Sequence, residues 1–165
     1  MSTALELVYQ YRFLRGKCEA GRGLSVDEIE ALGAIESLFS SKADPAEPRS
    51  HARETVDLPA QLRNRSLADR VRVVELAPGG MVCARAPYVD PGTALEVVID
   101  DREVGLSYRF RARVTWQRDD GDDYVIGLEL VGTPVLMRFR ASTDDGDDGE
   151  TFDAATTARF DRVAA

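Results

Sequence analysis

The first 40 residues carry apolar side chains at intervals of three and four positions, the period of a helix with one buried face. These positions are Ala4, Leu7, Val8, Tyr11 and Leu14, and then Ile29, Leu32, Ile35, Leu38 and Phe39. Glycines from Gly16 onward interrupt the pattern, and Ser25 with Glu28 has the form of a capping box that opens a second helix. Residues 1–40 are therefore predicted to form a helical hairpin, whose apolar stripes need either the rest of the chain or a second copy to pack against.

After residue 40 the hydrophobic period changes from 3.6 to 2. Residues 41–48, SKADPAEP, are small, polar and proline-containing, and this composition predicts a linker. Beyond it, six segments have the pattern of strands, namely 56–62, 70–76, 80–84, 95–99, 106–116 and 124–130. In the clearest one, Leu106, Tyr108, Phe110, Ala112, Val114 and Trp116 alternate with polar residues and are expected on one buried face.

Turn signals separate these segments, and no helical pattern lies between them. Pro78-Gly79-Gly80, Asp90-Pro91-Gly92 and Asp119-Asp120-Gly121 are typical turn sequences. Parallel strands joined through helices are excluded, and a closed or nearly closed antiparallel barrel is favoured because closure hides the sheet edges. The expected fold is therefore mainly β, a six-stranded antiparallel β-barrel preceded by the helical hairpin.

The remaining residues, 139–165, form a strongly acidic tail that is predicted to be disordered, with a short helix near 154–163. The chain has no apolar run of about 20 residues and no signal-peptide pattern, so we expect a soluble, cytoplasmic protein without membrane insertion. Cys18 and Cys83 have no metal-ligand spacing and are expected to be two buried thiols.

The net charge of −8 argues against a general nucleic-acid binder, because phosphate backbones are held by an excess of basic residues. Arg109, Arg111 and Arg113 form a basic row, but the aromatic residues of the same strand are expected on its other face, so a solvated surface is favoured. One segment differs from the rest of the chain in its charge, which is positive. Residues 49–72 carry six arginines and three acidic residues, and a local positive field of this kind can hold a small anion.

A catalytic function has little support in the sequence. His51 is the single histidine, and no nucleophile elbow, metal-ligand spacing or glycine-rich phosphate loop accompanies it. We therefore expect neither an enzyme nor a resident cofactor.

The most informative short motif is Arg49-Ser50-His51-Ala52-Arg53, directly before the first strand. Two guanidinium groups at the end of a linker can fold onto a barrel and bind a dianion, because each offers a planar set of donors to phosphate. The alternative is an exposed arginine pair without a ligand, since this spacing also occurs by chance.

The order of the motifs resembles the PilZ family. The arginine pair is followed by Glu75-Leu76-Ala77-Pro78-Gly79-Gly80, Pro91-Gly92-Thr93, Val114-Thr115-Trp116 and Tyr124-Val125-Ile126-Gly127-Leu128-Glu129-Leu130. The resemblance covers residues 49–138 and implies a six-stranded barrel that binds cyclic di-GMP through an Arg-x-x-x-Arg linker and an (Asp/Asn)-x-Ser-x-x-Gly motif. It places Arg49 and Arg53 on the first motif, and Glu75, Ala77 and Gly80 on the second.

The second motif departs from the family pattern at two positions. Glu75 is one methylene longer than Asp, and Ala77 lacks the hydroxyl of Ser. Loss of a neutral hydrogen bond costs about 0.5–1.5 kcal/mol, and loss of a charge-assisted one about 1.5–3 kcal/mol. These two substitutions therefore weaken the expected site.

Two hypotheses of function follow. The resemblance favours a non-catalytic bacterial signalling module in which cyclic di-GMP draws the arginine linker onto the barrel and changes what the hairpin binds. Its partner would be a regulated protein in motility, exopolysaccharide production or secretion, and a homodimer is possible. The alternative is a degenerate adaptor that keeps the fold, no longer binds the nucleotide, and acts through protein–protein contacts.

Overall fold

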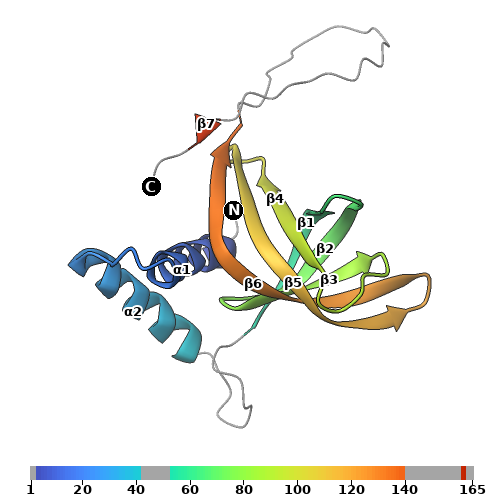
Figure 1. The fold of residues 1–165 in the computed structure, drawn as a ribbon, viewed down its shortest axis with the longest axis horizontal. Helices are drawn as coiled ribbons and strands as arrows, with labels where there is room; N and C mark the ends of the chain where they lie inside the picture. The colour runs from blue at the N-terminus through green and yellow to red at the C-terminus, as the bar shows by residue number, and fades with distance from the viewer. Residues whose placement is uncertain (1–2, 42–52, 140–160, 163–165) are drawn as a thin grey trace, which may run out of the picture.

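The computed structural model describes residues 3–41, 53–139 and 161–162, and consists of two helices followed by a sheet of antiparallel strands (Figure 1). The helices are α1 (Thr3–Glu19) and α2 (Val26–Ser41). The strands are β1 (Glu54–Arg63), β2 (Ala68–Ala77), β3 (Gly80–Ala86), β4 (Ala94–Asp101), β5 (Leu106–Asp120), β6 (Asp123–Arg138) and β7 (Asp161–Arg162).

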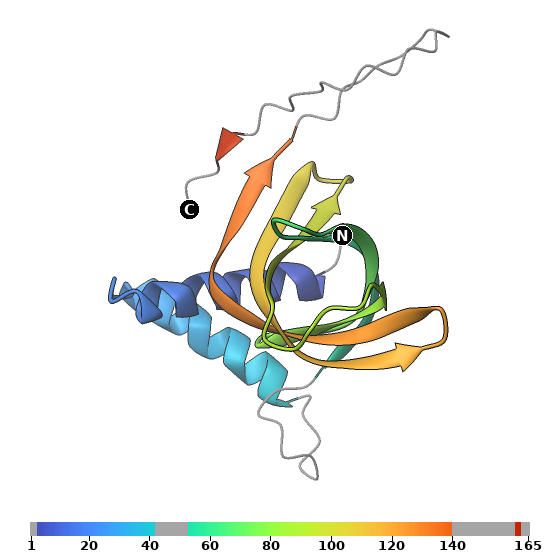
Figure 2. The same ribbon diagram turned by 45° about the vertical axis from the view of Figure 1, so that its right-hand side comes forward.

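Strands β1–β6 form a closed antiparallel barrel (Figure 2). Their order is β3-β2-β1-β4-β5-β6, and pairing of β3 with β6 closes the ring. The side chains that alternate along these strands meet in one hydrophobic core, which includes Leu62, Val73, Val97, Phe110 and Ile126. The expected fold, a six-stranded antiparallel barrel with two helices before it, is confirmed.

Helix α1 packs against the barrel at β6 (Figure 1). Its residues in the same core as the strands are Ala4, Leu5, Val8, Tyr9 and Tyr11. Arg12 is buried, and its Nη2 donates a hydrogen bond to the carbonyl oxygen of Gly132 at 2.9 Å. The helix also continues through Gly16, where the sequence pattern had placed its end. A Cβ at Gly16 would collide with Thr133 of β6, so this glycine serves the close contact between helix and barrel.

Helix α2 begins at the expected capping box. The Ser25 amide donates to Glu28 Oε2 at 2.9 Å, and the Glu28 amide donates to Ser25 Oγ at 3.2 Å. Only part of its apolar surface is covered: Ile35 and Phe39 are buried, whereas Val26, Ile29 and Leu38 are 71%, 57% and 50% exposed. The helix extends to Ser41, and the remainder of the predicted linker, 42–48, lies outside the described residues.

Strand parity is correct for β3 but wrong at the end of the predicted buried face of β5. Met81 and Cys83 are 3% and 0% exposed and point into the core as expected. Trp116 was expected inside, but a β-bulge between Val114 and Trp116 reverses the parity, and the indole lies on the outer face, 37% exposed. The expectation of two buried thiols also fails for Cys18, which is exposed near the end of α1.

In the acidic tail, Asp161 and Arg162 form β7, which pairs with Arg138 and Met137 of β6. At these two positions the structure has a strand and not the short helix predicted near 154–163. The other tail residues beyond Phe139 lie outside the described part of the chain.

Candidate ligand-binding pocket

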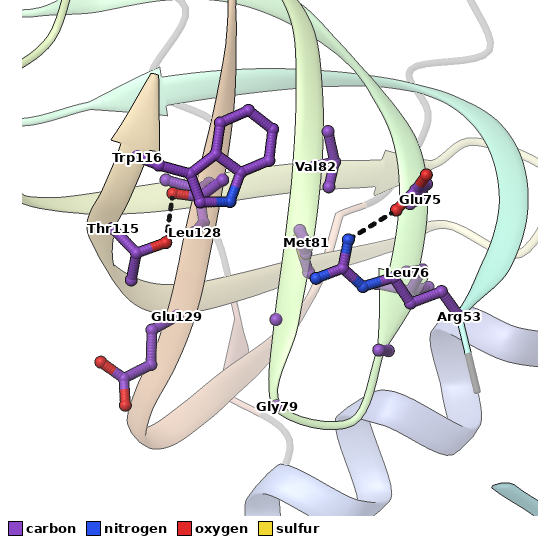
Figure 3. A pocket seen from close by; sticks show the side chains of 13 residues that line it. Arg53, Glu75, Leu76, Gly79, Met81, Val82, Thr115, Trp116, Leu128 and Glu129 are labelled. Atoms are coloured by element: carbon purple, nitrogen blue, oxygen red, sulfur yellow. Dashed lines mark hydrogen bonds and ion pairs between the residues drawn. The ribbon is translucent and has the colours of Figure 1, made fainter. Parts of the chain in front are cut away.

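A pocket of about 370 Å³ lies on the outer face of the barrel, where β2, β3, β6 and β5 run side by side (Figure 3). We call it the outer-face pocket. It is lined by Arg53, Glu75, Leu76, Ala77, Gly79, Gly80, Met81, Val82, Thr115, Trp116, Gly127, Leu128 and Glu129. Four of the five predicted site residues, Arg53, Glu75, Ala77 and Gly80, therefore lie together, and the fifth, Arg49, lies outside the described residues.

Arg53 lies against the barrel rather than pointing away from it. Its Nη1 donates to Glu75 Oε2 at 2.9 Å, and the two side chains are 35% and 41% exposed (Figure 3). The arginine motif and the barrel motif are thus in direct contact, although 22 positions separate the two residues. Because the pair is partly solvated, its net stabilisation is about 0–1 kcal/mol, small enough for a stronger anion to displace the carboxylate.

The turn between β2 and β3 lines the pocket through Ala77, Gly79 and Gly80. A Cβ at Gly80 would lie 2.6 Å from the carbonyl oxygen of Leu128, so a side chain at this position would push β3 away from β6. The carbonyl oxygen of Gly79 accepts a hydrogen bond from the Leu130 amide at 2.9 Å, which ties the turn to β6. Ala77 lines the pocket and offers it no hydroxyl.

The opposite wall was not predicted from the sequence. Trp116 lies over Gly127, and a Cβ added at Gly127 would collide with the pyrrole ring of the indole. Thr115 Oγ1 donates to the carbonyl oxygen of Gly127 at 3.1 Å. The available signal was Gly127 itself, because a glycine within a strand pattern often marks a close approach or a bulge on the neighbouring strand.

The charges in the pocket are unevenly distributed. Arg53 is the one cation among the described residues that line it, whereas Glu75 and Glu129 contribute two carboxylates. Glu129 lies opposite Arg113 in the strand register, and Glu75 forms an ion pair with Arg53. Binding of a dianion here therefore requires release of Arg53 from Glu75, and a second cation such as Arg49 would strengthen it.

In the described part of the chain, no group of three or more His, Cys, Asp or Glu side chains is arranged to hold a metal ion. Neither described helix is long and apolar enough to cross a membrane.

Comparison with known proteins identifies the family. The model of the PilZ domain matches residues 47–142, more than half of the chain, so the chain belongs to the PilZ family. Domains of this family are generally non-catalytic binding modules, and the resemblance inferred from the sequence motifs is confirmed.

Among solved structures, the chain is similar to MotI/DgrA, an inhibitor of motility from Bacillus subtilis. The two are 18% identical with a TM-score of 0.46, and the match covers 53% of this chain and 44% of that chain. The matched region is therefore less than half of the length of MotI/DgrA. A search of curated proteins gave no match.

Proposed function

We propose that the chain is a cyclic di-GMP-responsive effector that binds the messenger in the outer-face pocket and regulates a partner protein without catalysing a reaction. The main support is that Arg53 of the linker and Glu75, Ala77 and Gly80 of the barrel line the same pocket. Residues from two separate motifs meet there, as a ligand held between linker and barrel requires.

In this proposal Arg53 moves from Glu75 to a phosphate group of the messenger. A guanidinium binds a phosphate through two parallel donors, and a phosphate oxygen competes well with a partly solvated carboxylate. Arg49, four residues earlier, supplies the second guanidinium to the same dianion. Ala77 removes one hydrogen bond from the barrel side, so we expect weaker binding than a serine at this position gives.

Strand β6 offers a route from the pocket to the hairpin. Gly127 and Glu129 line the pocket, and Gly132 and Thr133, a few residues further along the same strand, contact α1 through Arg12 and Gly16. Because α1 shares the barrel core, we propose that the signal passes through small shifts of β6 and not through a hairpin that swings free. The partner would bind α2, whose Val26, Ile29 and Leu38 are exposed apolar side chains.

Calorimetric titration with cyclic di-GMP at low and moderate salt tests the proposal. We expect saturable binding that weakens as the salt concentration rises, and at least a tenfold loss of affinity in Arg53→Ala. Arg102→Ala is the matched control, because it removes one exposed positive charge outside the pocket. Equal losses in the two variants would mean that only the general field of the protein attracts the ligand, and absence of binding by the unmodified chain would refute the proposal.

The second candidate is an adaptor that keeps the PilZ fold without binding the nucleotide. Two observations favour it: Arg53 is already paired with Glu75, and Ala77 lacks a hydroxyl. Calorimetry separates the two candidates, because the adaptor gives no heat with cyclic di-GMP at any salt concentration.

A further inference from the structure

Trp116 lies outside the core, unlike the aromatic residues that precede it on the same strand. Along β5 the aromatic residues Tyr108 and Phe110 are 2% and 1% exposed in the core, whereas Trp116 is turned outward by the bulge that follows Val114. It is the only tryptophan in the sequence. The bulge thus places a large aromatic side chain in the wall of the outer-face pocket instead of in the core.

Trp116 lies in line with the charged end of the pocket. Register pairs connect Glu75 to Val82, Val82 to Gly127, and Gly127 to Trp116, so these four residues form one row across β2, β3, β6 and β5. With neighbouring strands about 4.8 Å apart, the row spans about 14 Å between the Cα atoms at its ends. Figure 3 shows the Arg53–Glu75 pair on one side of Val82 and the indole on the other.

Gly127 allows the indole to lie against the barrel. The pyrrole ring occupies the space that a side chain at this position would fill, so the backbone of Gly127 supports the ring. Val82 beside it is 7% exposed although it points outward, while the indole itself keeps more than a third of its surface exposed. The ring is therefore held in place and still presents an open aromatic surface to the pocket.

A pocket with a guanidinium at one end and an exposed indole at the other suits a ligand that carries both a phosphate and an aromatic base. Bases stack on aromatic side chains, and the contact requires no particular hydrogen-bond pattern. We propose that Trp116 is a stacking residue for one purine base of the bound nucleotide. This inference rests on the proposed function and adds a contact that neither arginine nor turn motif supplies.

The single tryptophan makes the inference directly measurable, because intrinsic fluorescence excited at the indole reports on this position alone. We expect saturable quenching by cyclic di-GMP with the same midpoint as the calorimetric titration. Inorganic pyrophosphate, which has the charge but no base, should leave the fluorescence unchanged. Quenching of equal size by pyrophosphate would overturn the stacking role.

Two substitutions separate stacking from a structural role. Trp116→Phe keeps an aromatic ring and should bind within about threefold of the unmodified chain, whereas Trp116→Leu keeps apolar cover over Gly127 and should bind roughly tenfold more weakly. Thermal unfolding of both variants shows whether the barrel is intact. If Trp116→Leu is folded and binds as tightly as Trp116→Phe, the inference fails while the proposed function stands. If the unmodified chain shows no binding by calorimetry, both fail.

Discussion

Substitution of Glu75 by Gln tests whether the carboxylate competes with the ligand for Arg53. Glu75→Gln keeps the size of the side chain and removes its charge, so the guanidinium loses its ionic partner while the pocket keeps its shape. The two side chains are joined at 2.9 Å, and each is more than a third exposed. We therefore expect Glu75→Gln to fold normally and to bind cyclic di-GMP more tightly.

The size of the gain follows from two contributions. Breaking a partly exposed ion pair costs about 0.2–1 kcal/mol, which the ligand no longer has to supply. A carboxylate about 6 Å from a bound phosphate adds a repulsion of about 0.7–1.4 kcal/mol at an effective dielectric constant between 80 and 40. Together these amount to about 0.9–2.4 kcal/mol, or roughly a five- to fiftyfold lower Kd.

The assay is calorimetric titration of the unmodified chain, Glu75→Gln and Glu129→Gln at two salt concentrations. Glu129→Gln is the matched control, because it removes the same charge from the same pocket without freeing Arg53. Its gain should be smaller, and the gain from Glu75→Gln should shrink at high salt as screening weakens both contributions. Weaker binding by Glu75→Gln would refute the reasoning, because it would mean that Glu75 contacts the ligand favourably.

Three further predictions concern the fold. Burial raises the pKa of the Cys83 thiol to about 12, so a thiol-reactive probe at pH 8 should label Cys83 at least a hundredfold more slowly than the exposed Cys18. Similar labelling rates at the two cysteines would mean that the core opens at β3. Gly80→Ala should lower Tm by roughly 5–10 °C because its Cβ meets the Leu128 carbonyl, whereas Gly79→Ala, with nothing within 4 Å, should change it by less than about 2 °C. Deletion of residues 141–165 should change Tm by no more than about 2 °C, because β7 pairs only two residues with the end of β6 and the tail is acidic and poor in apolar residues. A loss of several degrees would show that this pairing supports the barrel.

The number and direction of the strands could be predicted because each strand has one buried face, and alternation of apolar residues reports that face directly. The same pattern failed at Trp116. A bulge adds one residue to the alternation, and its position depends on the neighbouring strand, where Gly127 leaves room for the indole. The continuation of α1 through Gly16 was missed for a related reason, since the contact with Thr133 exists only after the helix has packed on β6.

The candidate site was predictable only in part. The spacing of Arg53, Glu75, Ala77 and Gly80 matches family motifs, and the structure brings all four to one pocket. The sequence did not predict the ion pair between Arg53 and Glu75, because the contact depends on where the folded barrel places Arg53 relative to β2. Charge and spacing along the sequence identify which side chains belong to the candidate site. The fold decides which of these side chains contact one another.

The central claim is that the arginine linker and the turn between β2 and β3 form the two halves of one cyclic di-GMP site. The most direct measurement is a calorimetric mutant cycle that combines Ala77→Ser with Arg53→Ala. We predict that the restored hydroxyl tightens binding about two- to tenfold, as one hydrogen bond of about 0.5–1.5 kcal/mol allows, and that Arg53→Ala in this background removes the gain, because coupled groups are not additive. No binding by the restored variant at high messenger concentration, or a gain that persists without Arg53, would contradict the account.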